Sequence, residues 1–207
     1  MVRGNTLASF DAALDLGVDM IEFDVRAVHG RLGIAHNVLG AHLFGCPSLD
    51  AALAHLASPR FSGIELNVDL KHAGCEPGAL DALRRHGLLD RSLISCSLPR
   101  VLDRVHQLEP EVRTGLSVGG PLARRLTGLR DWRRLVGEAL AGGRFQALMA
   151  HHRLVDAELV GRVKDAGAEL YAWTVDEGPL IDRLCGLEVT GITTNDPRLF
   201  AARVATS

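Results

Sequence analysis

One pattern constrains the fold of this chain: short apolar segments with strand character alternate with helical segments along nearly its whole length. Such alternation is typical of parallel βαβ units, since a parallel strand needs a long crossover connection that is usually a helix. Seven segments have strand character, at residues 18–25, 63–71, 92–97, 113–118, 147–152, 169–175 and 190–194. Helical periodicity is found at residues 48–57, 76–87, 99–108, 131–143 and 156–167. The pattern predicts an α/β protein built on parallel strands.

The start of the chain distinguishes two architectures. A helical stretch over residues 6–17 comes first, with no strand before it. A helix followed by seven strands predicts a (β/α)8 TIM barrel whose first strand is missing or truncated. An open doubly wound sheet is the alternative, but no GxGxxG loop follows any strand. The chain has 207 residues, fewer than the roughly 250 usual for the barrel, which fits a shortened start. We predict a single barrel domain over residues 1–207.

Composition excludes several classes of function. The formal net charge is −2, so no overall positive field attracts nucleic acid or an acidic membrane. No apolar run reaches the roughly 18–20 residues of a membrane span, and the first residues lack the pattern of a signal peptide. The four cysteines are scattered without a CxxC pair, which favours small core residues in a reducing compartment. We therefore expect a cytoplasmic protein, and the sequence leaves its oligomeric state open.

Residues 21–37, IEFDVRAVHGRLGIAHN, predict a strand followed by a hairpin rather than by a helix. Polar Glu22 and Asp24 alternate with apolar residues, which is the period of a β-strand. After Asp24 the sequence changes from strand to turn to strand, with His29-Gly30 at the apex. Because Asp24 and His36 lie nearly equidistant from that apex, an antiparallel ribbon returns His36 to the two carboxylates.

Three carboxylates are predicted to converge. Glu22 and Asp24 lie two residues apart on one strand face, about 7 Å along the strand. Asp69 ends the next parallel strand, and the active site of a barrel lies at the C-terminal strand ends. Glu22 or Asp24 alone fits a structural acid paired with Arg26 or Lys71 equally well. Three acids on neighbouring strands favour a site for Mg²⁺ or Ca²⁺, whereas zinc prefers more His or Cys.

Several motifs, in this order, resemble the glycerophosphodiester phosphodiesterase family. They are NTLASFDAALDLGVDMIEFDV, a hairpin ending in His-Asn, VDLK, WTVD and GITTNDP, over about residues 3–200. The resemblance implies a TIM barrel that hydrolyses glycerophosphodiesters to glycerol 3-phosphate and an alcohol, a reaction of lipid metabolism. It also implies a divalent metal cofactor, Mg²⁺ or Ca²⁺, and a small-molecule phosphodiester substrate.

The same resemblance implies roles for individual residues. The family's metal-binding E-x-D motif matches Glu22 and Asp24. Its E-x-K motif matches Asp69, a shortened acid, and Lys71, which would neutralise a phosphate oxygen. The tryptophan that lines the family's substrate site matches Trp173.

The catalytic motifs match less well. His36 matches the histidine of the family's HD motif, but Asn37 replaces the aspartate that would orient it. The family's HRG motif has either a remnant at Val2-Arg3-Gly4, with Arg3 as the catalytic arginine and no histidine, or a counterpart upstream of Met1. We favour the second reading.

The missing histidine leaves alternatives open. Two histidines share the acid and base roles in the family, so activity of this chain is expected to be impaired. A non-catalytic barrel that binds a phosphoester or a metal is the alternative function. A phospholipase D-type toxin of the same superfamily is a weaker one, because the chain shows no signal peptide and its cysteines are scattered.

Overall fold

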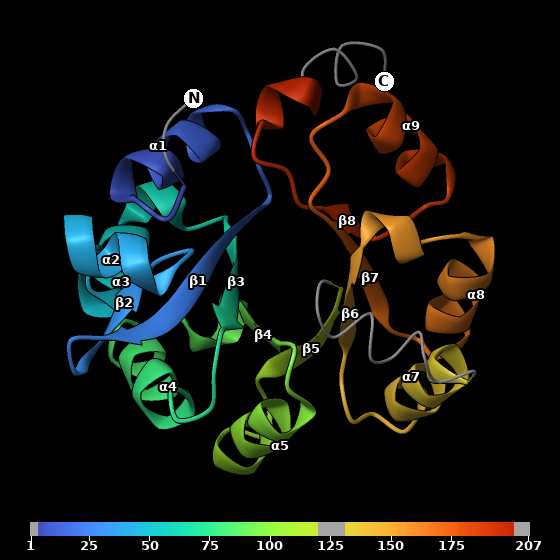
Figure 1. Cartoon of the computed structure of the whole chain (residues 1–207), viewed down its shortest axis with the longest axis horizontal. Helices are drawn as coiled ribbons and strands as arrows, with labels where there is room; N and C mark the ends of the chain where they lie inside the picture. The colour runs from blue at the N-terminus through green and yellow to red at the C-terminus, as the bar shows by residue number, and fades with distance from the viewer. Residues whose placement is uncertain (1–3, 120–130, 201–207) are drawn as a thin grey trace. The chain divides into compact units, whose positions relative to one another are not determined.

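The computed structural model describes residues 4–119 and 131–200. The chain divides into two compact units, residues 1–112 and 113–207, and each is described by itself. Strands and helices alternate in both, as the sequence predicts (Figure 1). The single domain over residues 1–207 stays a prediction.

Unit 1 contains four strands in the order β2-β1-β3-β4. Strands β1, β3 and β4 are parallel, whereas β2 runs antiparallel to β1. The strands are β1 (Met20–Val28), β2 (Arg31–Ile34), β3 (Glu65–Leu70) and β4 (Ser92–Cys96). The helices are α1 (Leu7–Asp15), α2 (Val38–Phe44), α3 (Leu49–Leu56), α4 (Glu76–Arg85) and α5 (Pro99–Leu108). Two short 3₁₀ turns, Pro59–Phe61 and Leu89–Arg91, precede β3 and β4. Among the described residues, no strand precedes α1.

The hairpin lies where the sequence predicts it. His29 and Gly30 both have positive φ, 50° and 76°, as a two-residue turn with the twist of a hairpin requires. Val25 pairs with Ile34 across the hairpin. One step further, the amide of Ala35 donates a hydrogen bond to the carbonyl of Asp24 over 3.0 Å. The returning strand therefore brings the chain back to Asp24.

Apolar and charged residues alternate along β1, so the strand has one apolar face and one charged face. Ile21, Phe23 and Val25 are at most 3% exposed and belong to the hydrophobic core, whose burial drives folding. Glu22 and Asp24 necessarily lie on the other side of the strand. Strand β3 repeats this arrangement, and its register with β1 places the two charged faces side by side.

Unit 2 contains four parallel strands in the order β5-β6-β7-β8. They are β5 (Arg113–Val118), β6 (Ala147–His151), β7 (Glu169–Trp173) and β8 (Gly191–Ile192). The described helices are α7 (Trp132–Ala141), α8 (Ala157–Asp165) and α9 (Gly178–Gly186), with 3₁₀ turns at His152–Leu154 and Pro197–Phe200. Asp156 begins α8 by accepting a hydrogen bond from the Leu159 amide, a standard N-cap.

Some features differ from the sequence analysis. Helices α2 and α9 were not among the predicted segments, and α2 escapes helical patterning because its large apolar side chains face outward. Cys75 and Cys96 are buried as predicted, whereas Cys185 is exposed. In the part of the chain that the structure describes, every helix is too short or too polar to cross a bilayer.

Candidate functional site

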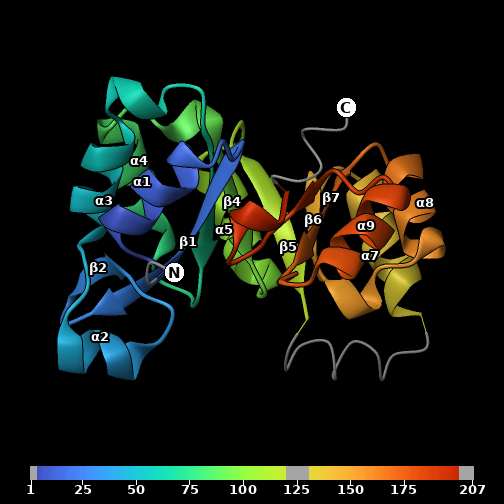
Figure 2. The same ribbon diagram turned by 90° about the horizontal axis from the view of Figure 1, so that it is seen from above.

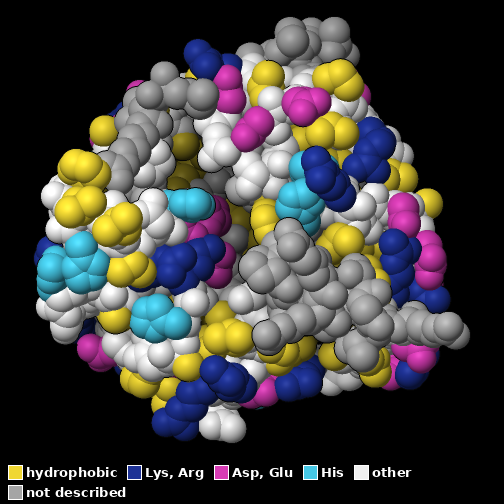
Figure 3. Space-filling view, in the orientation of Figure 1, with side chains coloured by type: hydrophobic (Ala, Val, Ile, Leu, Met, Phe, Trp, Pro, Cys, Tyr) yellow, Lys and Arg dark blue, Asp and Glu magenta, His cyan; other side chains and the backbone are white. Residues whose placement is uncertain are grey.

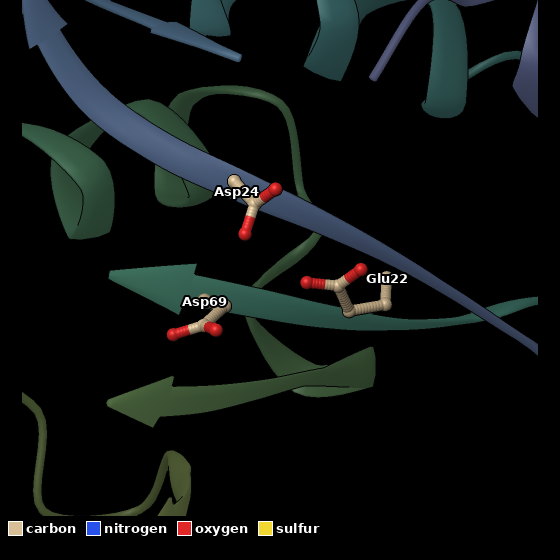
Figure 4. A group of neighbouring side chains, drawn as sticks. All are labelled: Glu22, Asp24 and Asp69. Atoms are coloured by element: carbon tan, nitrogen blue, oxygen red, sulfur yellow. The ribbon is translucent and has the colours of Figure 1, made fainter. Parts of the chain in front are cut away.

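Glu22, Asp24 and Asp69 point toward one another from neighbouring strands (Figure 4). Asp24 and Asp69 are direct partners in the parallel register of β1 and β3, and Glu22 lies two residues before Asp24. One carboxylate oxygen from each residue lies within 4.8 Å of the others. The structure thus brings together the three predicted metal ligands, at a spacing that a single cation can bridge.

Lys71 follows directly after β3 and joins two of these acids. Its Nζ lies 2.5 Å from Oδ1 of Asp24 and also pairs with Oδ2 of Asp69. The amide of Lys71 donates to the carbonyl of Val25 over 3.1 Å, which extends the pairing of β1 and β3 by one residue. The ammonium group is therefore paired with two of the three acids.

The acid cluster shifts the pKa of its members. Burial, followed by the charges of Asp24 and Asp69, raises the pKa of Glu22 from 4.5 to about 8, with a smaller opposing effect of Lys71. Burial also raises the pKa of Asp69. Burial alone would lower the pKa of Lys71, but Asp69 and Asp24 outweigh it and raise that pKa. One lysine does not fully compensate three carboxylates, and a bound divalent cation would keep Glu22 ionised.

Asn5 holds Asp24 in place, a role that was not predicted from the sequence. Its Nδ2 donates to Oδ2 of Asp24 over 2.9 Å, and its Oδ1 accepts from the Asp24 amide over 2.8 Å. Asn5 has φ 58°, in the left-handed region that Asn tolerates better than most residues. The next residue, Thr6, caps α1 by accepting from the Ser9 amide. The loop before α1 is therefore tied to the acid cluster, and the Asn-Thr pair opening the first helix was the available clue.

Two buried polar atoms test whether these residues fit a metal. Asn67 Oδ1 and Ser95 Oγ are buried without a hydrogen-bond partner within the described part of the chain. Asn67 is the register partner of Glu22, and Ser95 that of Asp69. Buried polar groups without partners are uncommon and indicate a missing ligand or water. Together with a donor set made only of oxygen, they fit a hard divalent cation with its water shell.

His36 and Asn37 follow the hairpin. Arg26 donates to the carbonyl of Ala35 from Nε and to that of His36 from Nη2, both over 3.1 Å, which fixes the backbone there. The His36 side chain is exposed. The Asn37 side chain accepts from the Gly40 amide over 2.6 Å and begins α2. Asn37 therefore acts as a helix cap in place of an orienting partner for His36.

The remaining predicted site residues are Arg3 and Trp173. Arg3 is outside the described residues. Trp173 ends β7 in unit 2, where its Nε1 donates to the carbonyl of Met149 over 3.0 Å. Its ring packs edge-on against His151, with centroids 5.2 Å apart, and a Cβ at Gly119 would lie 2.5 Å from its Cζ2. The substrate-lining role of Trp173 stays a prediction, as do the metal, catalytic and phosphate roles of the other residues.

Comparisons with solved structures identify the fold. The chain is similar to a glycerophosphodiester phosphodiesterase from Parabacteroides distasonis, with TM-score 0.76, 18% identity, and 98% of this chain and 90% of that chain covered. It is also similar to an Oleispira antarctica phosphodiesterase solved with the product sn-glycerol-3-phosphate, with TM-score 0.74, 22% identity, and 97% and 91% covered. These likenesses confirm the predicted TIM-barrel fold class.

Sequence comparisons identify the family. A glycerophosphodiester phosphodiesterase from Caldanaerobacter subterraneus subsp. tengcongensis is 25% identical over 233 residues, which covers 95% of this chain and 90% of that protein. The model of the glycerophosphoryl diester phosphodiesterase family matches residues 2–29 and 66–199. This match includes the predicted metal ligands and Trp173 but not the segment with His36. Since it spans most of the chain, the protein belongs to the glycerophosphoryl diester phosphodiesterase family, which confirms the predicted family and enzyme class.

Proposed function

We propose that this chain hydrolyses glycerophosphodiesters to sn-glycerol 3-phosphate and an alcohol, with Mg²⁺ or Ca²⁺ held by Glu22, Asp24 and Asp69. The observation that carries the proposal is the convergence of these three carboxylates, within 4.8 Å, beside Lys71. Family membership and the product-bound relative support the substrate class.

The proposed chemistry starts from the charge of the substrate. A phosphodiester is an anion that repels nucleophiles, and a divalent cation, when bound, neutralises that charge and polarises phosphorus. Lys71 contributes a second positive charge on the same side, placed to stabilise the oxygen on which charge develops. Asn5 keeps the Asp24 carboxylate oriented, so the cluster is preorganised before the substrate arrives.

Proton transfer is assigned to His36. One group must take a proton from the attacking hydroxyl and one must protonate the departing alcohol. His36 is exposed, next to a hairpin whose backbone hydrogen bonds lead to Asp24, which suits a group that exchanges protons with substrate. We assign Arg3 to the phosphate and Trp173 to the substrate's organic part. The cytoplasmic location stays a prediction.

The proposed activity is weaker than that of relatives with a complete HRG motif. The second histidine is absent from the chain's only candidate for that motif, Val2-Arg3-Gly4, and Asn37 is engaged as a helix cap. A non-catalytic barrel that binds a metal or phosphoester is therefore the second candidate function. The Asn37 cap is the observation that favours it, because His36 then has no carboxylate at the neighbouring position.

The two functions separate in one experiment. Release of sn-glycerol 3-phosphate from a glycerophosphodiester is measured with Mg²⁺, with Ca²⁺ and with chelator, for the wild type, Glu22→Ala and Val2→His. Metal-dependent release that Glu22→Ala abolishes and Val2→His increases supports hydrolysis. Calorimetric binding of metal and phosphoester without turnover in any variant indicates the binding barrel. Absence of metal binding in the wild type contradicts both.

A further inference from the structure

Helix α2 has an unusual distribution of apolar side chains. A helix of a globular protein normally directs its large apolar residues to the core. In α2 the buried residue is the small Ala41, 2% exposed, while Leu39, Leu43 and Phe44 are 70%, 66% and 77% exposed. Val38 adds a fourth outward apolar side chain, 41% exposed. We call Val38, Leu39, Leu43 and Phe44 the α2 patch.

The helix is held firmly in this orientation. Asn37 caps its first turn, and just beyond its end the carbonyl of Pro47 accepts a hydrogen bond from the Ile34 amide over 3.0 Å. Ala41 packs with Val28 and Ala35 under the helix. Figure 2 shows α2 beside β2 at one end of unit 1. Arg26 ties the residues before the helix to β1 and Pro47 ties those after it to β2, so the fold itself presents the α2 patch to the outside.

The segment that carries the patch contains arginines and histidines but no acidic residue. No Asp or Glu occurs between Asp24 and Asp50, whereas Arg26 and Arg31 do, together with three histidines. Arg31 is exposed and has no ion-pair partner in residues 4–119 or 131–200. The ring of His42, on α2, lies edge-on to that of His29, with centroids 4.2 Å apart. In Figure 3 hydrophobic and His side chains gather at the left edge of the face shown, where Figure 1 places α2.

We propose that the α2 patch docks this chain onto an anionic lipid surface. Leu39, Leu43 and Phe44 enter the boundary between head groups and acyl chains, and Arg31 contacts the negatively charged head groups. Large apolar side chains combined with basic residues are the features by which a short helix binds such a surface. Each basic residue near an anionic surface adds a further attraction.

A second copy of the chain fits the patch less well. An aromatic side chain buries about 150–250 Å² and an aliphatic one less, so four partly exposed side chains, one of them aromatic, offer at most roughly 500 Å², less than the roughly 800 Å² per partner of a stable interface. In a two-fold dimer the same surface meets itself. The two copies of Arg31 would then belong to one interface, with no acid between residues 25 and 49 to compensate them.

The location of the patch adds a functional consequence. The family match skips residues 30–65, so α2 lies outside the pattern that this chain shares with the family model. Asn37, which begins α2, directly follows His36. A lipid surface bound by α2 therefore lies next to the histidine assigned to proton transfer. Binding itself does not depend on the proposed function, but presentation of a lipid-derived phosphodiester to His36 does.

Vesicle sedimentation with the full chain tests the proposal. Vesicles of phosphatidylcholine with phosphatidylglycerol are compared with vesicles of phosphatidylcholine alone. We expect the wild type to bind the anionic vesicles and the double variant Leu43→Ser/Phe44→Ser to lose about 100-fold in partition coefficient. Arg31→Glu is expected to lose about tenfold. Leu16→Ser, at another exposed leucine of unit 1, is the matched control and keeps full binding.

The other possible results of this experiment also support or overturn the proposal. Circular dichroism and metal calorimetry that match the wild type show that the double variant is folded, and its loss then belongs to the lipid contact. Failure of the wild type to bind anionic vesicles, or equal loss in Leu16→Ser, overturns the proposal. So does a dimer in analytical ultracentrifugation that the double variant abolishes, because the patch is then a contact between copies. Lipid binding without any phosphodiesterase activity leaves this inference intact and counts only against the proposed function.

Discussion

The strands of the two units carry different kinds of functional side chains. In unit 1, Glu22 and Asp24 lie in the part of β1 that pairs with β3, Asp69 lies at the second-to-last position of β3, and Lys71 follows directly after β3. In unit 2, β6 and β7 end in His151 and Trp173, whose rings contact each other. The first set consists of charged side chains, three of which are joined by ion pairs, and the second of two rings packed edge-on.

This difference shows how one repeated framework serves two purposes. Both units use parallel strands connected by helices, so the framework alone does not distinguish them. The residues at the strand ends do, and in this fold those ends carry the function. The metal and phosphate roles proposed above belong to the first set, and the substrate contact proposed for Trp173 belongs to the second. The predictions below test this division.

The largest effect is expected from Asp24→Asn. The variant keeps the shape of the side chain but removes the negative charge, which forms an ion pair with Lys71 and accepts a hydrogen bond from Asn5. Metal affinity measured by calorimetry should be lost, and activity should fall at least about 10³-fold, since a catalytic metal supplies several kcal/mol. Trp173→Leu is the control and should bind metal normally. Unchanged metal affinity in Asp24→Asn would remove the charged half of the comparison.

His36→Gln should separate catalysis from binding. Because general acid–base catalysis contributes about 10²–10⁴-fold, we expect kcat to fall within that range while metal affinity stays the same. The measurement is steady-state kinetics together with calorimetry on the same preparation. A full loss of metal affinity would show that His36 is a ligand, and unchanged kcat would exclude it from the reaction.

Asn5→Ala should weaken the metal site without touching the metal ligands. Residues that orient a ligand typically change metal affinity by about 10–100-fold, and Asn5 makes two hydrogen bonds to Asp24. Calorimetric titration checks the value, and Ser9→Ala, which disturbs only the capping box of α1, is the control. Equal loss in both variants would mean that helix stability accounts for the effect.

Metal affinity should depend on pH through Glu22. Its pKa, raised to about 8 by burial and by Asp24 and Asp69, means that binding releases a proton at lower pH. Affinity should therefore rise with pH, by up to about tenfold per unit below pH 8, and then level off. Glu22→Gln should bind weakly with a flatter profile. A flat wild-type profile would contradict the buried, coupled acid.

The raised pKa of Glu22 also makes the folding stability of the metal-free protein depend on pH. The folded pKa of this carboxyl, about 8, lies above the ordinary 4.5, so the folded form binds the proton more tightly than the unfolded form. The corresponding stabilisation is complete below about pH 4.5 and is lost as pH rises toward 8. Thermal unfolding in chelator should show Tm falling over this range in the wild type and less in Glu22→Gln.

Trp173→Leu is expected to have the smallest effect. The variant loses the ring contact with His151 and the hydrogen bond to Met149, and contacts of this size correspond to about a threefold to tenfold change. If Trp173 lines the substrate site, KM rises by that factor while metal affinity stays constant. A change in Tm alone, without a change in KM, would limit Trp173 to packing in unit 2.

Much of the fold could be predicted because local patterns and tertiary structure agree. Strand periodicity located β1 and β3, and His29-Gly30 located the hairpin, since a two-residue turn with positive φ favours such residues. The convergence of Asp24 and Asp69 followed from the parallel register. These predictions needed only neighbouring strands and the geometry of one turn.

Other features could not be predicted because they depend on tertiary contacts. The link from Asn5 to Asp24 joins residues 19 positions apart through a loop conformation that the sequence does not specify. Helix α2 depends on its Asn37 cap and on one small buried residue, Ala41, while its outward apolar side chains conceal the usual helical pattern. Compared with the family's HD motif, Asn37 stands where an aspartate is expected. Only the structure shows that its side chain instead accepts a hydrogen bond from the Gly40 amide.

The lysine at the end of β3 has a consequence for how the protein selects among ions. The Lys71 ammonium group already pairs with Asp24 and Asp69. Because it is part of the same chain, it competes with any cation for these carboxylates at a fixed effective concentration. A monovalent ion such as Na⁺ or K⁺ carries no more charge than the Lys71 ammonium group, so replacing that group gains little binding energy. A divalent ion carries twice the charge and gains more. The proposed metal site would therefore favour divalent over monovalent ions through charge.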